Sequence, residues 1–189
     1  VIVQPATNRI RILGVHLKPF ALSYFTNSEI IELPLIIKAN NLLKSNINTF
    51  QKKVNQTEDL TIIFESLEAL ILSNLKDKNL SLISKSIELI DNSFGLIKIS
   101  SIAEQVNASE RTLRNHFKRH IGISPKEYSQ LVKLKKVISD LKLSQSNLTS
   151  ISNQDFFDQS HFIKMIKAFT GKLPQSLKEE LPNFRFLQF

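Results

Sequence analysis

Cysteine is absent from the 189 residues of this chain. Its absence excludes disulfide bonds, thiolate zinc sites and cysteine nucleophiles, and it suits a reducing compartment. The longest apolar runs, such as residues 33–37, are far shorter than the ~20 residues that a transmembrane helix requires. No signal-peptide pattern opens the chain. We therefore expect a cytoplasmic protein with no membrane partner. Because the chain begins with Val1, we also expect it to be a fragment or processed form.

Glycine and proline are scarce, at four and six residues, and segments that alternate apolar with polar residues are nearly absent. The exception is the start of the chain, where residues 9–12 and 15–17 predict one or two short strands around Gly14. After Pro34 the spacing becomes helical, and it predicts one apolar stripe over residues 60–75 and a second over residues 82–90. We expect Gly95 to end this second helix in a left-handed conformation.

The positive charge of the chain lies almost entirely in its second half. The net charge is +8, and residues 98–189 hold 15 Lys and Arg against 8 Asp and Glu. Residues 1–97 are close to neutral, with 10 against 9. Such asymmetry is typical of a domain that faces a polyanion. Charge alone does not distinguish this reading from a merely soluble basic domain.

A short internal repeat runs through the basic half at an offset of 49 residues. Apolar positions, one lysine, one glycine and one proline all recur in register. Since glycine and proline are so rare here, a chance match at one shared offset is a poor explanation, and the repeat predicts two copies of one small helical unit. The matched pairs are Leu113 with Phe162, Phe117 with Ile166, Lys118 with Lys167, Gly122 with Gly171, and Pro125 with Pro174.

The first copy has the pattern of a helix-turn-helix. Apolar residues between positions 99 and 106 predict a short helix, Asn107 suits a left-handed turn, and Ser109 suits the cap of the next helix. That second helix would bury Leu113 and Phe117. An α-helix fits the major groove of DNA, Arg and Asn pair with purine edges, and Lys neutralises phosphate. The outer face of the helix carries these residue types at Arg111, Arg114, Asn115 and Lys118.

A longer helix is expected to join the two copies. Ser124, Pro125 and Glu127 form a capping box with proline in the first turn. If this helix spans about 17 residues, it is roughly 25 Å long, which could hold two reading helices near one DNA turn, ~34 Å, apart. In the second copy we expect a short helix near residues 148–154 and a reading helix that begins at Asp158. The expected buried side of the joining helix consists of Tyr128, Leu131, Val132, Ile138 and Leu141.

Histidine side chains are candidate metal ligands. His116 and His120 are four residues apart, a spacing that can bind zinc on a helix. No third ligand is evident near them, and His161 has no second ligand at a suitable spacing on its helix. A helix lying on a phosphate backbone explains the first pair more simply. We therefore expect neither a metal ion nor another cofactor.

At these residues the sequence resembles the AraC-type family of bacterial transcription regulators. The first copy carries the resemblance in SIAE at 101–104, SERTL at 109–113 and GISPKEY at 122–128. The second and most specific stretch is FDQSHFIK at 157–164, followed by Phe169, Gly171 and Pro174. The resemblance covers about residues 96–180, and a lone helix-turn-helix would not show the second stretch.

The resemblance implies a monomer that reads double-stranded DNA by placing one helix of each unit into adjacent major-groove segments. Asn115 stands where the family commonly has Arg, so the first unit would bind more weakly or prefer adenine. The family commonly activates transcription, which makes RNA polymerase a further expected partner. By position, the implied base-facing residues are Arg111, Arg114, Asn115, Gln159, Ser160, Ile163 and Lys164. Lys118, Lys133 and Lys167 complete the expected DNA-binding set.

The resemblance also implies a fold class and a domain division. Residues 12–19 look like the final strands of a cupin-like sensor found in part of the family. The expected fold is mainly α, with two helix-turn-helix subdomains joined by a linker helix and preceded by a helical connector and a short β remnant. The expected divisions are 1–39 for the remnant of a β-rich sensor, 40–94 for the connector, 95–182 for the DNA-binding domain and 183–189 for a tail.

Three alternatives remain beside this reading. The basic helix faces could be ordinary solvated surface, or the chain could be a helical interaction module that has lost contact with DNA. An enzyme is the third class, but a related DNA-repair methyltransferase needs a cysteine that is absent here, and Glu104, Glu110 and Glu127 are explained as helix-start charges.

The stripe over residues 60–75 could pack against residues 80–92 or pair with a second copy in a homodimer.

Overall fold

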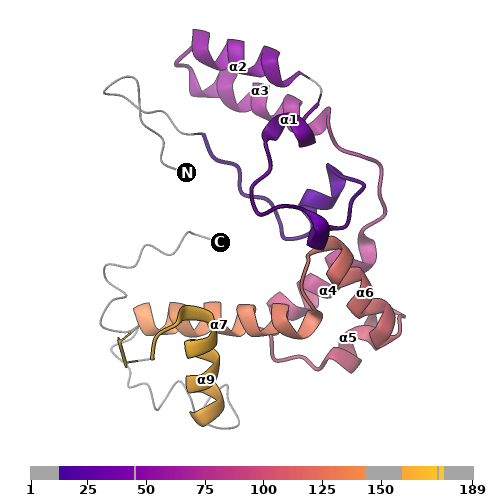
Figure 1. The fold of residues 1–189 in the computed structure, drawn as a ribbon, viewed down its shortest axis with the longest axis vertical. Helices are drawn as coiled ribbons and strands as arrows, with labels where there is room; N and C mark the ends of the chain where they lie inside the picture. Colours follow the sequence, from indigo (N-terminus) through magenta and orange to yellow (C-terminus); the bar gives the residue numbers. More distant parts are fainter. Residues whose placement is uncertain (1–12, 45, 144–158, 174, 177–189) are drawn as a thin grey trace.

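All regular secondary structure in the described part of the chain is helical. The computed structural model describes residues 13–44, 46–143, 159–173 and 175–176, and Figure 1 shows their arrangement. The mainly α class is therefore confirmed. No helix within these ranges is long and apolar enough to cross a bilayer.

The strand expected at residues 15–17 is wrong, because this segment has no regular structure. A strand is stable only when a neighbouring strand pairs with it, and the described ranges contain no strand that could do so. Val15 is 47% exposed instead. Residues 9–12 lie outside the described ranges.

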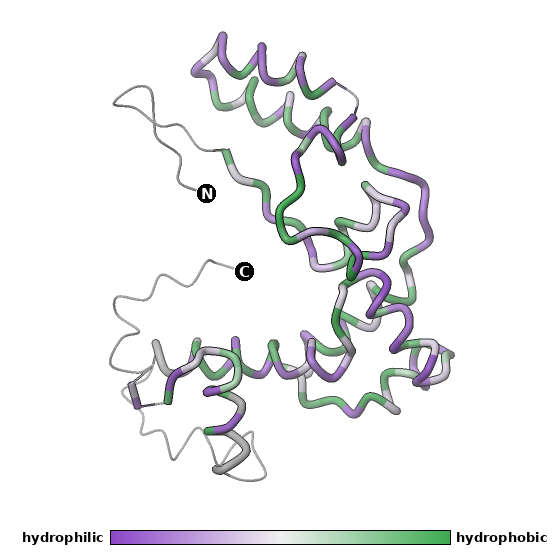
Figure 2. Tube along the Cα trace, viewed as in Figure 1, coloured by the Kyte–Doolittle hydropathy of each residue, from purple (hydrophilic) through white to green (hydrophobic). Residues whose placement is uncertain are grey.

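Residues 21–72 form two short 3₁₀ helices, one short α-helix and a helical hairpin. In the hairpin α3 packs against α2, and α3 is largely apolar along its length (Figure 2). Ile63 and Leu70 are buried, whereas Phe64 of the same stripe is 55% exposed. The structure therefore differs from the expected packing against residues 80–92, because α2 supplies a closer apolar face after a short turn. The elements are η1 Ala21–Tyr24, η2 Ile30–Glu32, α1 Ala39–Leu42, α2 Ile47–Gln56 and α3 Leu60–Leu72.

Four consecutive helices between residues 81 and 143 share one hydrophobic core. The second apolar stripe is confirmed, since Ile83, Ile87 and Ile90 of α4 are buried. This helix, which the sequence assigns to the connector, packs against the three helices that follow it. Phe20 from the N-terminal segment completes the same core. The helices are α4 Ser81–Asn92, α5 Ile99–Gln105, α6 Glu110–His120 and α7 Pro125–Leu143.

The expected helix starts are confirmed at atomic detail. Asn107 has φ +52° in the turn before α6, and the Ser109 hydroxyl accepts a 3.0 Å hydrogen bond from the Thr112 N–H. At the start of α7 the Ser124 N–H donates to the Glu127 carboxylate at 2.7 Å, while the Glu127 N–H donates back to the Ser124 hydroxyl at 3.2 Å. The Ser124 hydroxyl also donates to the Glu127 carboxylate at 2.6 Å, and this bond, followed by the one from the Ser124 N–H, lowers the pKa of Glu127. Each helix therefore begins at a reciprocal or single side-chain cap.

The joining helix α7 has 19 residues, two more than expected. Tyr128 and Ile138 are buried as expected. Leu131 is 39% exposed, so its predicted burial is wrong, and Leu134 and Val137 are buried in its place. Helix α7 contacts α4 and α6 at one end and α9 at the other, so its buried side changes along its length. The spacing of its apolar residues therefore does not define one buried side.

The internal repeat is a structural repeat within the described residues. Phe117 and its counterpart Ile166 are both fully buried, and Gly122 and Gly171 end their helices at φ +91° and +71°. The second helix of the repeat is α9 Gln159–Thr170, which packs against α7. Residues 144–158, Pro174 and residues 177–189 lie outside the described ranges, as does the short helix expected at 148–154.

Gly95 occupies a position where two constraints coincide. Its φ of +76° confirms the expected left-handed end of α4, and its N–H donates to the Ile90 carbonyl at 2.8 Å. A Cβ placed on Gly95 would lie 2.2 Å from the backbone oxygen of Ser129 in α7. The close contact between α4 and α7 therefore depends on the missing side chain.

We predict that Gly95→Ala lowers the free energy of unfolding by about 2–3 kcal/mol, because it adds both backbone strain and a clash with α7. Urea denaturation followed by circular dichroism measures this loss. Gly14→Ala is the matched control, since no atom lies within 4 Å of its added Cβ. Equal stability of the two variants would show that Gly95 is not required for the left-handed turn and the contact with α7.

Candidate nucleic-acid interface

Helix α6 separates its side chains into a buried and an exposed side. Leu113 and Phe117 are fully buried. The four residues expected to contact DNA on this helix are all exposed, and their spacing of three, four and seven places them on one side. The structure therefore brings together Arg111, Arg114, Asn115 and Lys118.

The orientation of α6 is held by contacts to the neighbouring helices. The rings of Phe117 and Tyr128 lie 5.9 Å apart, and the Tyr128 hydroxyl donates a 3.1 Å hydrogen bond to Asp91 of α4. Burial, followed by the Asp91 charge and hydrogen bond, raises the pKa of Tyr128 well above its usual value. Burial also raises the pKa of Asp91, although the Tyr128 hydrogen bond opposes this. Tyr128 is thus a neutral donor that links α4, α6 and α7.

The second unit presents a comparable side on α9. Lys164 and Lys167 are exposed, Ile163 is 36% exposed, and Ile166 is fully buried. Gln159 and Ser160 belong to the first turn of α9, but the positions of their side chains lie outside what the structure describes.

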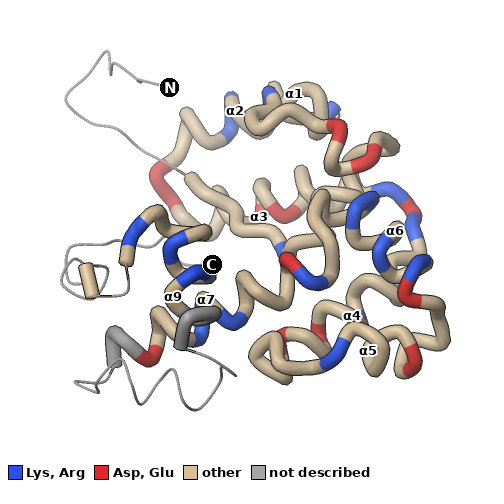
Figure 3. The backbone as a smooth tube through the Cα atoms, turned by 60° about the horizontal axis from the view of Figure 1, so that its bottom comes forward, with Lys and Arg blue, Asp and Glu red and all other residues tan. Residues whose placement is uncertain are grey.

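The two units lie at opposite ends of α7. In Figure 1, α6 packs beside one end of this helix and α9 beside the other. Figure 3 shows that basic residues are present on α6, α7 and α9. A helix of 19 residues is about 28 Å long at 1.5 Å per residue. This spacing is of the order of one turn of DNA, ~34 Å.

Lys133 differs from the other expected DNA-binding residues. Its side chain is half-buried, and its Cγ lies 3.0 Å from the place that a Cβ on Gly95 would occupy. The aliphatic part of Lys133 therefore packs against the end of α4.

His116 and His120 lie on a different side of α6 from Arg114. Their rings are 5.6 Å apart, and the Nδ1 of His120 is 3.1 Å from the Ser23 hydroxyl. Within the described ranges no three His, Asp or Glu residues are grouped to hold a metal ion. The pair instead faces the N-terminal segment, which differs from the expected position on a DNA backbone.

The N-terminal segment covers this second side of α6, a contact that sequence reasoning missed. Helix η2 packs against α6, and Glu29 lies 3.9 Å from Arg119 in an exposed ion pair. The Ser23 hydroxyl lies 3.4 Å from the His120 carbonyl, to which it donates. No signal in the sequence pointed to this contact, because it joins residues almost 100 positions apart.

This fold and this arrangement of exposed basic side chains define a helix-turn-helix domain. The family model described as "Helix-turn-helix domain" matches residues 102–180. Residues 102–180 therefore form a helix-turn-helix domain of the AraC type.

Curated relatives agree with this assignment. The Msm operon regulatory protein of Streptococcus mutans is 28% identical over 145 residues, which cover 72% of this chain and 52% of that protein. The HTH-type transcriptional activator RhaS of Escherichia coli is 24% identical over 134 residues, covering 68% of this chain and 48% of RhaS. The chain thus spans about half the length of the curated relatives it matches.

A solved structure supports the fold. The C-terminal domain of AraT, a response regulator from Geobacillus stearothermophilus, aligns with a TM-score of 0.50 and 19% identity. The alignment covers 57% of this chain and 88% of the AraT domain. At this level of identity the similarity concerns the fold.

We predict that His120 makes the fold less stable at acidic pH. Burial, and then the charges of His116, Arg119 and Lys78, lower the pKa of His120 below its usual 6.5. Between the pKa of His120 in the folded chain and pH 6.5, the unfolded chain binds a proton that the folded chain does not. This contribution to stability is therefore complete above pH 6.5 and is lost as the pH falls through the folded pKa.

Urea denaturation at pH 7.5 and pH 5.5 checks this prediction. His120→Gln should reduce the difference in unfolding free energy between the two conditions, whereas His16→Gln, at an exposed position, should not. An unchanged difference in His120→Gln would show that other groups cause the loss at low pH.

Proposed function

We propose that this protein is a sequence-specific transcription regulator that reads two adjacent major-groove segments of double-stranded DNA. The observation that carries the proposal is the division of α6, where Arg111, Arg114, Asn115 and Lys118 are exposed opposite two fully buried side chains. Exposed Arg and Asn on one side of a helix can make paired hydrogen bonds to base edges. Lys118 is suited to a phosphate, which positions the helix without reading sequence.

The second unit extends the readout along the DNA. Lys164 and Lys167 are exposed on α9, and α7 separates α9 from α6 by a distance suited to successive turns of the groove. In this proposal Gln159, Ser160 and Ile163 join Lys164 at the base edges, and Lys167 contacts the backbone. Lys133 contributes through its ammonium group, since its stem is packed on α4.

The proposal includes transcription activation. Its support is the similarity to RhaS, whose name describes an HTH-type transcriptional activator. An activator acts on RNA polymerase, so the polymerase is the second proposed partner.

We predict different losses for base and phosphate contacts. Arg114→Ala and Gln159→Ala should each weaken binding to the specific site by about 1–3 kcal/mol, with little change on random DNA. Lys118→Ala should weaken binding to both DNAs and reduce the salt dependence. Lys53→Ala is a charge-matched control, because Lys53 is exposed on α2 within the helical hairpin.

The measurement is fluorescence anisotropy with the DNA upstream of the protein's own gene, random duplex as competitor and a series of salt concentrations. Preference for the upstream DNA together with a steep fall in affinity with salt supports the proposal. Equal losses on specific and random DNA for all three variants would overturn the assignment of base contacts. Absence of binding at low salt would favour a helical protein-interaction module.

A further inference from the structure

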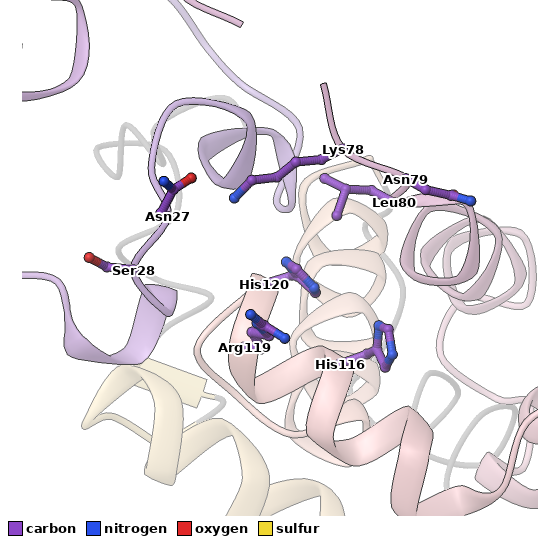
Figure 4. Close-up of a pocket in the computed structure, with 8 residues that line it drawn as sticks. All are labelled: Asn27, Ser28, Lys78, Asn79, Leu80, His116, Arg119 and His120. Atoms are coloured by element: carbon purple, nitrogen blue, oxygen red, sulfur yellow. The ribbon is translucent and has the colours of Figure 1, made fainter. Parts of the chain in front are cut away.

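A pocket of about 340 Å³ opens where three distant segments of the chain meet beside α6. One wall comes from the loop between η1 and η2, a second from the residues that precede α4, and a third from α6 itself. Figure 4 shows the side chains of these segments around the opening. The lining residues are Asn27, Ser28, Lys78, Asn79, Leu80, His116, Arg119 and His120.

Basic groups dominate this lining. Lys78, Arg119 and two histidines line the pocket, and none of the eight lining residues is acidic. Glu29 lies at its edge, with one carboxylate oxygen 3.9 Å from the Arg119 Nε. Both members of that pair are about half exposed or more, so water weakens their attraction. One partly screened carboxylate does not neutralise the positive charge of Lys78, Arg119 and the two histidines.

The basic groups affect one another through space. Burial, followed by the charges of Lys76 and Arg119, lowers the pKa of Lys78. The positive charges of Lys78 and Arg119 also act on His120, whose pKa burial lowers. Like charges held at short range favour the binding of an anion, because an anion between them removes the repulsion.

The remaining groups suit the polar part of a small molecule. Asn27, Ser28 and Asn79 supply neutral hydrogen-bonding groups, and Leu80 is a buried apolar residue. His120 can add a donor. Since the Ser23 hydroxyl donates to the His120 carbonyl, the nearby Nδ1 of His120 can donate to that hydroxyl. This leaves Nε2 as the nitrogen that takes up a second proton.

We propose that this pocket binds a small polar organic anion, whose phosphate or carboxylate group is held by Lys78, Arg119 and His120. The volume exceeds that of an isolated phosphate and accommodates a hydroxylated molecule of a few carbon atoms. Three lining residues belong to α6, so an occupied pocket ties the DNA-facing helix to the N-terminal segment. This last consequence rests on the proposed function, whereas ligand binding itself does not.

The test uses the 189-residue chain without DNA and four probes: inorganic phosphate, glycerol 3-phosphate, glycerate and glycerol. Isothermal titration calorimetry should detect an organic anion with a Kd of about 1 mM or below, and no binding of glycerol. The tighter of glycerol 3-phosphate and glycerate identifies the preferred charged group. In histidine NMR titrations, the bound anion should raise the pKa of His120, on which the charges of His116, Arg119 and Lys78 act.

Lys78→Gln and Arg119→Gln should each lower the affinity about tenfold, because each removes one charged contact to the anion. Lys85→Gln, at an exposed position of α4, is the charge-matched control and should bind normally. Circular dichroism verifies that each variant is folded, and the His120 signal of each folded variant gives an independent measure of binding.

Three outcomes overturn the proposal. The first is no binding of either organic anion at about 10 mM. The second is an equal loss in Lys85→Gln, which would indicate general charge attraction. The third is a shift of the His120 signal with duplex DNA but with none of the small anions, which would make the cluster part of the DNA surface. Failure of DNA binding with intact anion binding would instead overturn only the proposed function.

Discussion

Helix α6 can pack in one orientation, and this constraint determines which of its residues reach solvent. Leu113 and Phe117 are fully buried against α4, α5 and α7. Burying each such side chain contributes about 1.5–3 kcal/mol, which exceeds what an exposed pair such as Arg119 with Glu29 contributes. Rotation of α6 would expose both side chains. The outward position of Arg114 and Lys118 is therefore a consequence of apolar packing.

Helix α7 carries this constraint to the second unit. Its capping box sets where it begins, and Gly95 allows it to lie directly against the end of α4. The far half of α7 packs against α9, whose Ile166 is buried like Phe117. A continuous helix is stiff over this length, so the separation of the two basic sides depends on the number of residues in α7.

The N-terminal segment covers a third side of α6. One side is packed in the core, one is exposed with Arg and Asn, and one faces η1 and η2 with two histidines and Arg119. Because all three sides belong to one helix, a shift of α6 relative to the core would move all three together. The burial of Ser23 and Phe20 shows that this segment is part of the same folded body as α4 to α7.

The sequence by itself determined the local features: the caps at Ser109 and Ser124, the left-handed residues Asn107 and Gly95, and the helical repeat. Each depends on neighbours within a few residues. Tertiary structure decided which side of α7 is buried, so that Leu134 replaces Leu131. It also left residues 15–17 without a partner strand among the described residues. It also formed the pocket, because Asn27, Lys78 and His116 meet only after the chain has folded, and no local pattern records which distant segments will pack together.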